Sequence, residues 1–287
     1  MTLNLNLKKF KPSGMPDNAT CILLGKRRTG KTTITLDIMY NKRFMPCGVV
    51  ISGTEESNHT FKDIVPDTFI YGEYKPEILE RVFVRQKKLT NHNQNKIDKG
   101  ETSQMIDSKV FIILDDCMYD KKILKGTNIR NLFMNGRHRK IFFISCQQYI
   151  MDMPPELRGQ VDYVFALRDP IISNKEKLWK FFFGMFEKLQ DFTQVMDRCT
   201  QNFDCMVFDS TAKSTAIEDC VFWYRADLHP EGFQMGKPIY TRYHKEYERS
   251  DGNGVEYDED DDQGDGGGKA GLMVRKVAEN GRPMPRR

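Results

Sequence analysis

Residues 21–33 read Cys-Ile-Leu-Leu-Gly-Lys-Arg-Arg-Thr-Gly-Lys-Thr-Thr. From Gly25 to Thr32 the stretch matches the pattern G-x-x-x-x-G-K-[ST] without a mismatch. Residues 21–24, before the pattern, suit a buried strand, and residues 32–40, at its end, can form a helix. Glycines let the backbone curl so that N–H groups point inward at an anion, and the helix directs the positive end of its dipole there. The stretch predicts a phosphate-binding P-loop; the alternative is a glycine-rich surface turn.

The side chains of this loop have separate expected roles. Lys31 would reach the β- and γ-phosphates of a nucleotide, and the hydroxyl of Thr32 would ligate Mg²⁺. The predicted nucleotide contacts are Gly25, Lys26, Arg27, Arg28, Thr29, Gly30, Lys31, Thr32 and Thr33.

Composition places the chain among globular proteins. Its 287 residues are 39% hydrophobic and 29% charged, enough for one large domain or two small ones. No stretch approaches the roughly 18 apolar residues of a membrane span, and residues 1–11 lack the apolar core of a signal peptide. Seven scattered cysteines without a Cys-x-x-Cys pair indicate reduced thiols in a cytosol-like compartment.

Charge is distributed unevenly. Residues 1–250 hold 38 basic against 31 acidic side chains, an excess compatible with a polyanionic partner and equally with a plain enzyme. Residues 250–287 form an acidic tail rich in Gly and Asp that cannot bury a core. We expect this tail to be disordered, either as a solubilising extension or as a binding segment.

Apolar runs recur at intervals that suit an α/β domain with a mainly parallel sheet flanked by helices. Strands are expected at 21–24, 48–52, 68–71, 110–114, 140–145 and 163–167, and helices at 32–40, 76–89 and 123–134, with a polar loop at 90–107. A C-terminal elaboration follows, in which one long helix covers 174–201 and a β-hairpin pairs 205–208 with 220–224. The expected organisation is an N-terminal extension at 1–16, one domain at 17–249 and the tail.

A second chemical signal is the apolar strand at 110–114, which ends in Asp115 and Asp116. This is the Walker B arrangement, in which Asp115 would hold magnesium, through Thr32 or a bound water, beside the P-loop. Asp116 is then placed to orient and polarise an attacking water. The alternative is a pair of acids that closes a buried strand by chance.

Gln147 follows the next expected strand. A polar residue at the carboxyl end of a strand beside the Walker B strand can touch the γ-phosphate and sense hydrolysis; the alternative is a glutamine that merely starts a loop. The order of P-loop, acidic pair and polar strand end is that of RecA-like (ASCE) P-loop ATPases, which have an extra strand between the P-loop and Walker B strands. Nucleotide kinases usually place those two strands side by side.

Three further segments carry a resemblance: Asn-Gly-Arg-His-Arg-Lys at 135–140, Met-Pro-Pro-Glu-Leu-Arg at 153–158 and Asp-Tyr-Val-Phe at 162–165. With Gln147 between them, they resemble the FtsK/HerA superfamily of DNA-pumping ATPases, and within it the genome-packaging ATPases of nucleocytoplasmic large DNA viruses, the vaccinia-type ATPase among them. The resemblance covers about residues 19–168 and extends more loosely to 224.

The resemblance implies a ring of identical subunits that hydrolyses ATP with Mg²⁺ and translocates double-stranded DNA into a preformed capsid. It assigns Lys31 and Thr32 to ATP and magnesium, Asp115 and Asp116 to the Walker B pair, and Gln147 to the sensor. Related motors commonly have Glu where this chain has Asp116. An arginine finger would cross a subunit interface; Arg137 is the favoured candidate, ahead of Arg139 and Arg158.

The resemblance also bears on partners and location. Capsid or portal-vertex proteins are expected as further partners, in the virion or at the virus assembly site in the host cytoplasm. Basic side chains that could line a central pore and contact DNA phosphates without reading sequence are Arg85, Lys87, Lys88, Lys96 and Lys99. The alternative is that these residues form a charged helix face that contacts only solvent.

Two other functions are open from the sequence. A nucleoside or nucleotide kinase would also use a P-loop and arginines, but no acceptor pocket or lid is identifiable. A protein that binds ATP without turnover is the other, and the intact Lys31, Asp115 and Asp116 argue against it.

Overall fold

The structure is a computed structural model that describes residues 5–117, 121–148, 153–230 and 232–249. The chain divides into two compact units, Met1–His244 and Lys245–Arg287, and the first contains every element discussed below except the end of the last helix. The acidic tail predicted at 250–287 lies outside the described residues.

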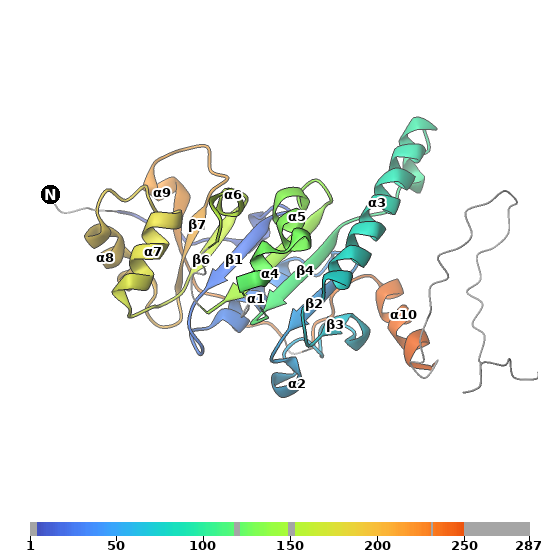
Figure 1. Ribbon diagram of the computed structural model, residues 1–287, viewed down its shortest axis with the longest axis horizontal. Coiled ribbons are helices and arrows are strands. Elements are labelled where there is room, and N and C mark those ends of the chain that lie inside the picture. Colours follow the sequence, from blue (N-terminus) through green and yellow to red (C-terminus); the bar gives the residue numbers. More distant parts are fainter. Residues whose placement is uncertain (1–4, 118–120, 149–152, 231, 250–287) are drawn as a thin grey trace, which may run out of the picture. The chain divides into compact units, whose positions relative to one another are not determined.

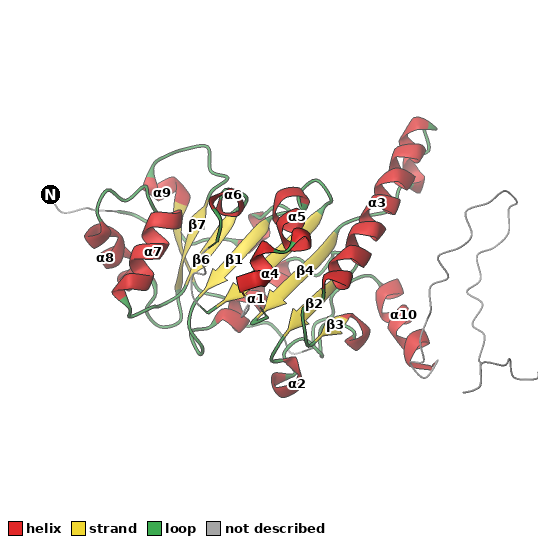
Figure 2. Ribbon diagram, viewed as in Figure 1, coloured by secondary structure: helices red, strands yellow, loops and turns green. Residues whose placement is uncertain are grey.

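One eight-stranded sheet organises the described chain, in the order β3-β2-β4-β5-β1-β6-β7-β8 (Figure 2). Neighbours from β3 to β6 pair in parallel, whereas β7 and β8 are antiparallel to their neighbours. The strands are β1 (Thr20–Leu24), β2 (Gly48–Ser52), β3 (Ile70–Tyr71), β4 (Val110–Asp115), β5 (Ile141–Gln147), β6 (Tyr163–Ala166), β7 (Cys205–Asp209) and β8 (Val221–Tyr224).

Helices cover both faces of the sheet, which is why its central strands are mostly apolar. Strand residues alternate between two core clusters, so that Ile22 packs on one face and Leu23 on the other. One face carries α1 (Lys31–Asn41) and the start of α10 (Pro238–Arg249). The other carries α3 (Pro76–Asp98), α4 (Lys121–Lys125), α5 (Thr127–Asn135), α6 (Pro155–Arg158), α7 (Ile172–Phe182) and α8 (Leu189–Cys199) (Figure 1). Short connections hold η1 (Pro12–Gly14), α2 (Glu55–Asn58), η2 (Asp67–Phe69), η3 (Thr102–Gln104) and α9 (Ile217–Cys220).

The strand order confirms the predicted fold class. β5 lies between β1, which leads into the P-loop, and β4, which carries the acidic pair. This is the extra strand expected of a RecA-like P-loop ATPase. The predicted β-hairpin is also confirmed, since β7 and β8 pair antiparallel at the end of the sheet.

The long helix predicted over 174–201 is wrong. The structure has two helices, α7 and α8, separated by residues 183–188, with Gly184 in the break. Phe183 and Phe186 in this connection are fully buried, and Phe183 packs 5.6 Å from the ring of Phe208 on β7. A single straight helix presents only one stripe of side chains to the sheet. The turn between α7 and α8 lets Phe183 and Phe186 both be buried.

The loop predicted at 90–107 is also wrong, because α3 continues through Asp98. The second half of this helix is fixed by polar contacts that an apolar pattern does not reveal. Asn93 is buried, donates to the backbone oxygen of Ile106 at 2.8 Å and accepts from its N–H at 2.9 Å. Smaller differences are the break at Gly126 that divides the helix predicted at 123–134, and the 3₁₀ turn that replaces the first half of the strand predicted at 68–71.

The N-terminal segment lies along β8. Lys9 forms a parallel bridge with Trp223, and the N–H of Phe10 donates to the oxygen of Trp223 at 2.9 Å. The buried ring of Phe10 packs against the rings of Tyr163 and Phe165. All seven cysteines are free thiols. Among the described residues, no helix has the length and apolar character needed to cross a bilayer.

Candidate nucleotide-binding site

The P-loop crosses the carboxyl edge of the sheet between the end of β1 and the start of α1. Two of its glycines are required by geometry. A Cβ on Gly25 would lie 2.7 Å from both the Cβ of Leu167 and the Oγ1 of Thr29, and Gly30 has φ of 100°, which other residues rarely adopt. The N–H of Gly25 donates to the oxygen of Gln147 at 3.1 Å, which ties the loop to β5.

Lys31 is buried within the concavity of the loop. Its Nζ donates to the backbone oxygens of Gly25 and, at 3.0 Å, Lys26. The exposed Thr32 faces a cavity of about 1060 Å³, a size that suits a nucleotide. Loop residues that line this cavity are Lys26, Arg27, Arg28, Gly30, Lys31, Thr32 and Thr33. Thr29 instead shapes the loop, with its hydroxyl donating to the oxygen of Lys26 at 2.7 Å.

The acidic pair reaches the same cavity from β4. Asp115 is the last residue of the strand and accepts a hydrogen bond from the hydroxyl of Ser52 at 3.3 Å. Asp116 follows with φ of 50°, a left-handed conformation that turns the chain at the strand end. Its carboxylate accepts from Nε2 of Gln148 at 2.7 Å. The predicted juxtaposition of P-loop and acidic pair is therefore what the structure has.

Burial raises the pKa of the Asp115 carboxyl, and the nearby charge of Asp116 raises it further. Hydrogen bonds from Cys146 and Ser52 and the ammonium of Lys31 act in the opposite direction without cancelling the rise. A cation beside Asp115 would stabilise its ionised form and so lower this pKa.

The donor set fits magnesium. Thr32 offers a hydroxyl and Asp115 a carboxylate, and Mg²⁺ is usually held by one or two carboxylates together with substrate phosphates and water. Groups of three or more His, Cys, Asp or Glu side chains that could hold a metal alone do not occur among the described residues. The site thus suits a metal that arrives with the nucleotide.

Gln147 ends β5, between the P-loop strand and the acidic-pair strand, as predicted. Its buried side chain donates to the hydroxyl of Ser145 at 3.1 Å. The following residue, Gln148, is the one that contacts Asp116. The role of Gln147 as a sensor stays a prediction.

The three candidate arginine fingers lie away from the cavity of their own chain, whose described lining includes none of them. Arg137 precedes β5 at the amino edge of the sheet and forms an ion pair with Asp162. The guanidinium of Arg139 lies 4.8 Å from the ring centre of Phe83, and that of Arg158 lies 4.0 Å from the ring centre of Phe181. Any of them could reach a triphosphate only on a neighbouring subunit, and that role stays a prediction.

The basic residues proposed for DNA contact lie on or just after one helix, α3. Lys87, Lys88 and Lys99 are exposed and Arg85 is half-buried. Lys96 is engaged with Glu101 at 2.6 Å. Their contact with DNA stays a prediction.

The far wall of the cavity comes from residues that the sequence does not mark. β7 runs antiparallel to β6, and β8 runs antiparallel to β7 and so in the direction of β6. The start of β7 and the end of β8 therefore lie at the carboxyl edge, beside the P-loop. This wall consists of Asn202, Phe203, Arg225, Ala226 and Leu228. The segment that follows β2 also lines the cavity, through Gly53, Thr54, Ser57 and Asn58. The predicted hairpin was the one available signal for the first group.

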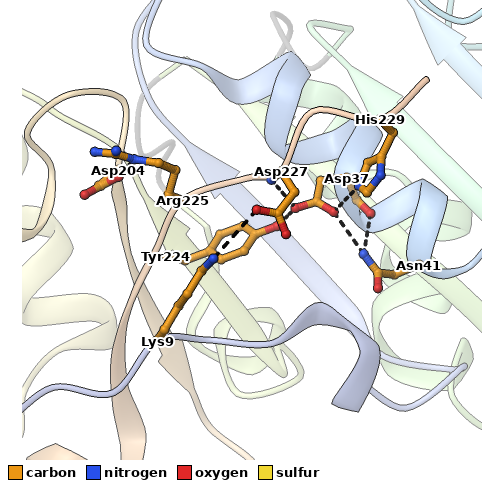
Figure 3. Close-up of polar contacts among 8 residues, drawn as sticks. All are labelled: Lys9, Asp37, Asn41, Asp204, Tyr224, Arg225, Asp227 and His229. Atoms are coloured by element: carbon orange, nitrogen blue, oxygen red, sulfur yellow. Dashed lines mark hydrogen bonds and ion pairs between the residues drawn. The ribbon is translucent and has the colours of Figure 1, made fainter. Parts of the chain in front are cut away.

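A buried carboxylate on the P-loop helix holds part of this wall (Figure 3). Asp37 on α1 accepts from the hydroxyl of Tyr224 and from the N–H of Asp227 at 2.9 Å. It also shares a 2.6 Å hydrogen bond with Nε2 of His229. The segment after β8 is thereby tied to the helix that begins with Lys31.

No model of a protein family matches the chain. The chain is 34% identical over 242 residues to uncharacterized protein L437 of Acanthamoeba polyphaga mimivirus, covering 84% of each. It is 36% identical over 206 residues to uncharacterized protein 015R of Frog virus 3 (isolate Goorha), covering 71% of this chain and 61% of the relative. Among solved structures, the genome packaging NTPase B204 of Sulfolobus turreted icosahedral virus 2, in complex with ATP-gammaS, has a TM-score of 0.48 at 13% identity, covering 75% of this chain and 100% of that one.

Proposed function

The chain belongs to the same protein family as protein L437 of Acanthamoeba polyphaga mimivirus, and from the site that it carries we propose that it is a magnesium-dependent ATPase that drives double-stranded DNA into a viral capsid. The observation that carries the hydrolytic part is the meeting of the P-loop, Asp115 and Asp116 at one cavity. The DNA part rests on the resemblance of residues 135–165 to genome-packaging ATPases.

In this proposal the chain's own residues divide the chemistry. Lys31 and the loop N–H groups bind the phosphates, which orients the γ-phosphate toward the acidic pair. Magnesium, when bound, neutralises charge on the phosphate oxygens, and Thr32 and Asp115 are the residues that would hold it. Asp116 accepts a hydrogen bond from the attacking water. Gln148 fixes the carboxylate of Asp116 through the 2.7 Å hydrogen bond.

Hydrolysis forms a bond from water to the γ-phosphorus and breaks the bond to the bridging oxygen, which yields ADP and phosphate. Gln147, between the two motif strands, is proposed to respond to that change. Arg137, or Arg158 in its place, is proposed to contact the site of the next subunit in a ring. The basic residues of α3 are proposed to contact DNA phosphates, so this binding should weaken as salt rises.

The strand order supports an ATPase over a nucleotide kinase, because β5 separates the P-loop strand from the acidic-pair strand. The chemistry can be tested directly. Purified protein is incubated with labelled ATP and Mg²⁺, with and without duplex DNA and with nucleosides as phosphate acceptors. We expect free phosphate at a rate that DNA increases; labelled nucleoside monophosphate would identify a kinase instead.

Lys31→Ala and Asp115→Ala are the variants for this assay. Each removes a group that touches phosphate or metal, and we expect each to lower turnover by at least about 100-fold. Lys180→Ala is a matched control, because Lys180 is an exposed lysine on α7 that pairs only with Glu176 among the described contacts. Full activity in both site variants would overturn the assignment of the site.

A further inference from the structure

Two apolar side chains stand exposed at the cavity that holds the P-loop. Phe203 is 70% exposed and Leu228 is 87% exposed, and both line that cavity. They come from different segments, one before β7 and the other after β8. Elsewhere near these strands the large aromatics are buried, as Phe183, Phe186 and Phe192 are. Two water-exposed apolar side chains in the lining of one cavity point to a ligand with an apolar face.

The backbone around Phe203 is held in an unusual conformation. Asn202 and Phe203 have φ of 52° and 67°, so two successive non-glycine residues are left-handed. For a bulky residue this conformation is strained, and such strain is concentrated at ligand clamps and functional sites. The turn brings Phe203 against the P-loop, since a Cβ built on Gly30 would lie 3.8 Å from the Cβ and Cδ1 of Phe203.

The two segments are joined to each other and to the P-loop helix (Figure 3). Asp204, next to Phe203, accepts from Nε of Arg225 at 2.5 Å. Arg225 belongs to the segment that Asp37 holds through Tyr224 and the N–H of Asp227. Phe203 and Leu228 therefore lie on two segments that are linked to each other and to α1 by hydrogen bonds.

The position of this pair relative to the acidic residues indicates which end of a nucleotide it meets. In the sheet order, β4 with Asp115 lies on one side of β1, whereas β6, β7 and β8 lie on the other. A triphosphate on the P-loop with its γ-phosphate toward Asp115 and Asp116 therefore has its nucleoside end toward Phe203 and Leu228.

We propose that Phe203 and Leu228 form the binding surface for the base of the nucleoside triphosphate, with Phe203 stacking on the base and the Asp204–Arg225 ion pair holding the surface together. This inference rests on the proposed function, because it extends the same site. Stacking on an aromatic ring accepts any flat base and grows with the area of the base. The surface should therefore favour purine over pyrimidine nucleotides.

Calorimetry with the full chain and Mg²⁺ separates base binding from phosphate binding. The titrants are ATP, CTP and inorganic tripolyphosphate, which has the phosphates without a base. For the unaltered protein we expect ATP to bind more tightly than CTP, and CTP more tightly than tripolyphosphate. Phe203→Ala should weaken ATP binding by about tenfold and leave tripolyphosphate binding unchanged. Phe203→Trp, which keeps a stacking face, should retain ATP affinity.

Phe44→Ala is the matched control, since Phe44 is 49% exposed and lies outside the described lining of the cavity. It should bind all three titrants as the unaltered protein does. Equal binding of ATP and tripolyphosphate by the unaltered protein would overturn the base surface and keep the phosphate site. Unchanged ATP affinity in Phe203→Ala, or equal losses for ATP and tripolyphosphate, would also overturn the base surface. Binding of none of the titrants would overturn the proposed function, and the base surface with it.

Discussion

Asp115 lies at the proposed metal site, and ionisation of its carboxyl group destabilises the folded chain. Burial and the neighbouring Asp116 raise its pKa, so the ionised form is less stable in the folded chain than in the unfolded one. The contribution of such a group to stability is present below its unfolded pKa and is lost as the pH rises through its folded pKa. At neutral pH the nucleotide-free protein is therefore destabilised by the carboxylate that its proposed metal site needs.

We predict that Asp115→Asn raises the melting temperature of the nucleotide-free protein at neutral pH, and that the gain shrinks as the pH falls through the acid range. Asp17→Asn should do the opposite. Burial opposes ionisation of Asp17, but hydrogen bonds from Lys42 and Lys109 outweigh it and lower the pKa. Removing this charge should therefore lower the melting temperature at neutral pH. Thermal scans across pH check both, and a lower melting temperature for Asp115→Asn at neutral pH would contradict the assignment.

At the scale of elements, the local motifs and the hairpin were predictable from sequence, whereas the place where the hairpin joins the sheet and the polar contacts of α3 were not. The P-loop and the strand that ends in Asp115 can each be identified from about a dozen consecutive residues. The wall with Phe203 and Arg225 stands beside the P-loop because the predicted hairpin joins the sheet through the pairing of β7 with β6, which no short pattern specifies. The second half of α3 was missed for a related reason, since its partner is the backbone of Ile106 rather than an apolar stripe.

The importance of that polar contact can be measured. We predict that Asn93→Ala lowers the free energy of unfolding by about 1–3 kcal/mol, because the N–H and oxygen of Ile106 both lose their side-chain partner. Asn91→Ala on the same helix is the control, since Asn91 is exposed. Urea unfolding followed by circular dichroism gives both values. Equal stabilities of the two variants would show that the helix end does not depend on Asn93.

At the scale of the whole molecule, the placement of Arg137, Arg139 and Arg158 means that the proposed arginine finger would come from a neighbouring chain. Arg137 lies at the amino edge of the sheet, whereas the P-loop lies at the carboxyl edge. Arginine fingers typically raise hydrolysis rates by several orders of magnitude. A separated subunit should therefore bind ATP and hydrolyse it poorly.

Mixing two inactive variants tests this arrangement. Lys31→Ala removes the phosphate contact and Arg137→Ala removes the finger. If each site takes its arginine from a neighbour, a random equal mixture should recover about a quarter of the unaltered activity. Parallel mixtures with Arg158→Ala and Arg139→Ala identify which arginine acts. Recovery with none of the three would contradict a finger supplied by these residues across an interface.

The path of the N-terminal segment limits how copies of this chain can join. At Trp223 the outer backbone groups of β8, the last strand of the sheet, are taken up by Lys8 and Phe10. At the opposite edge, β3 offers two residues. Open strand edges are where sheets of separate molecules fuse. With β8 covered at Trp223 and β3 short, subunits of the proposed ring would meet through side-chain surfaces, which can shift as each site hydrolyses ATP.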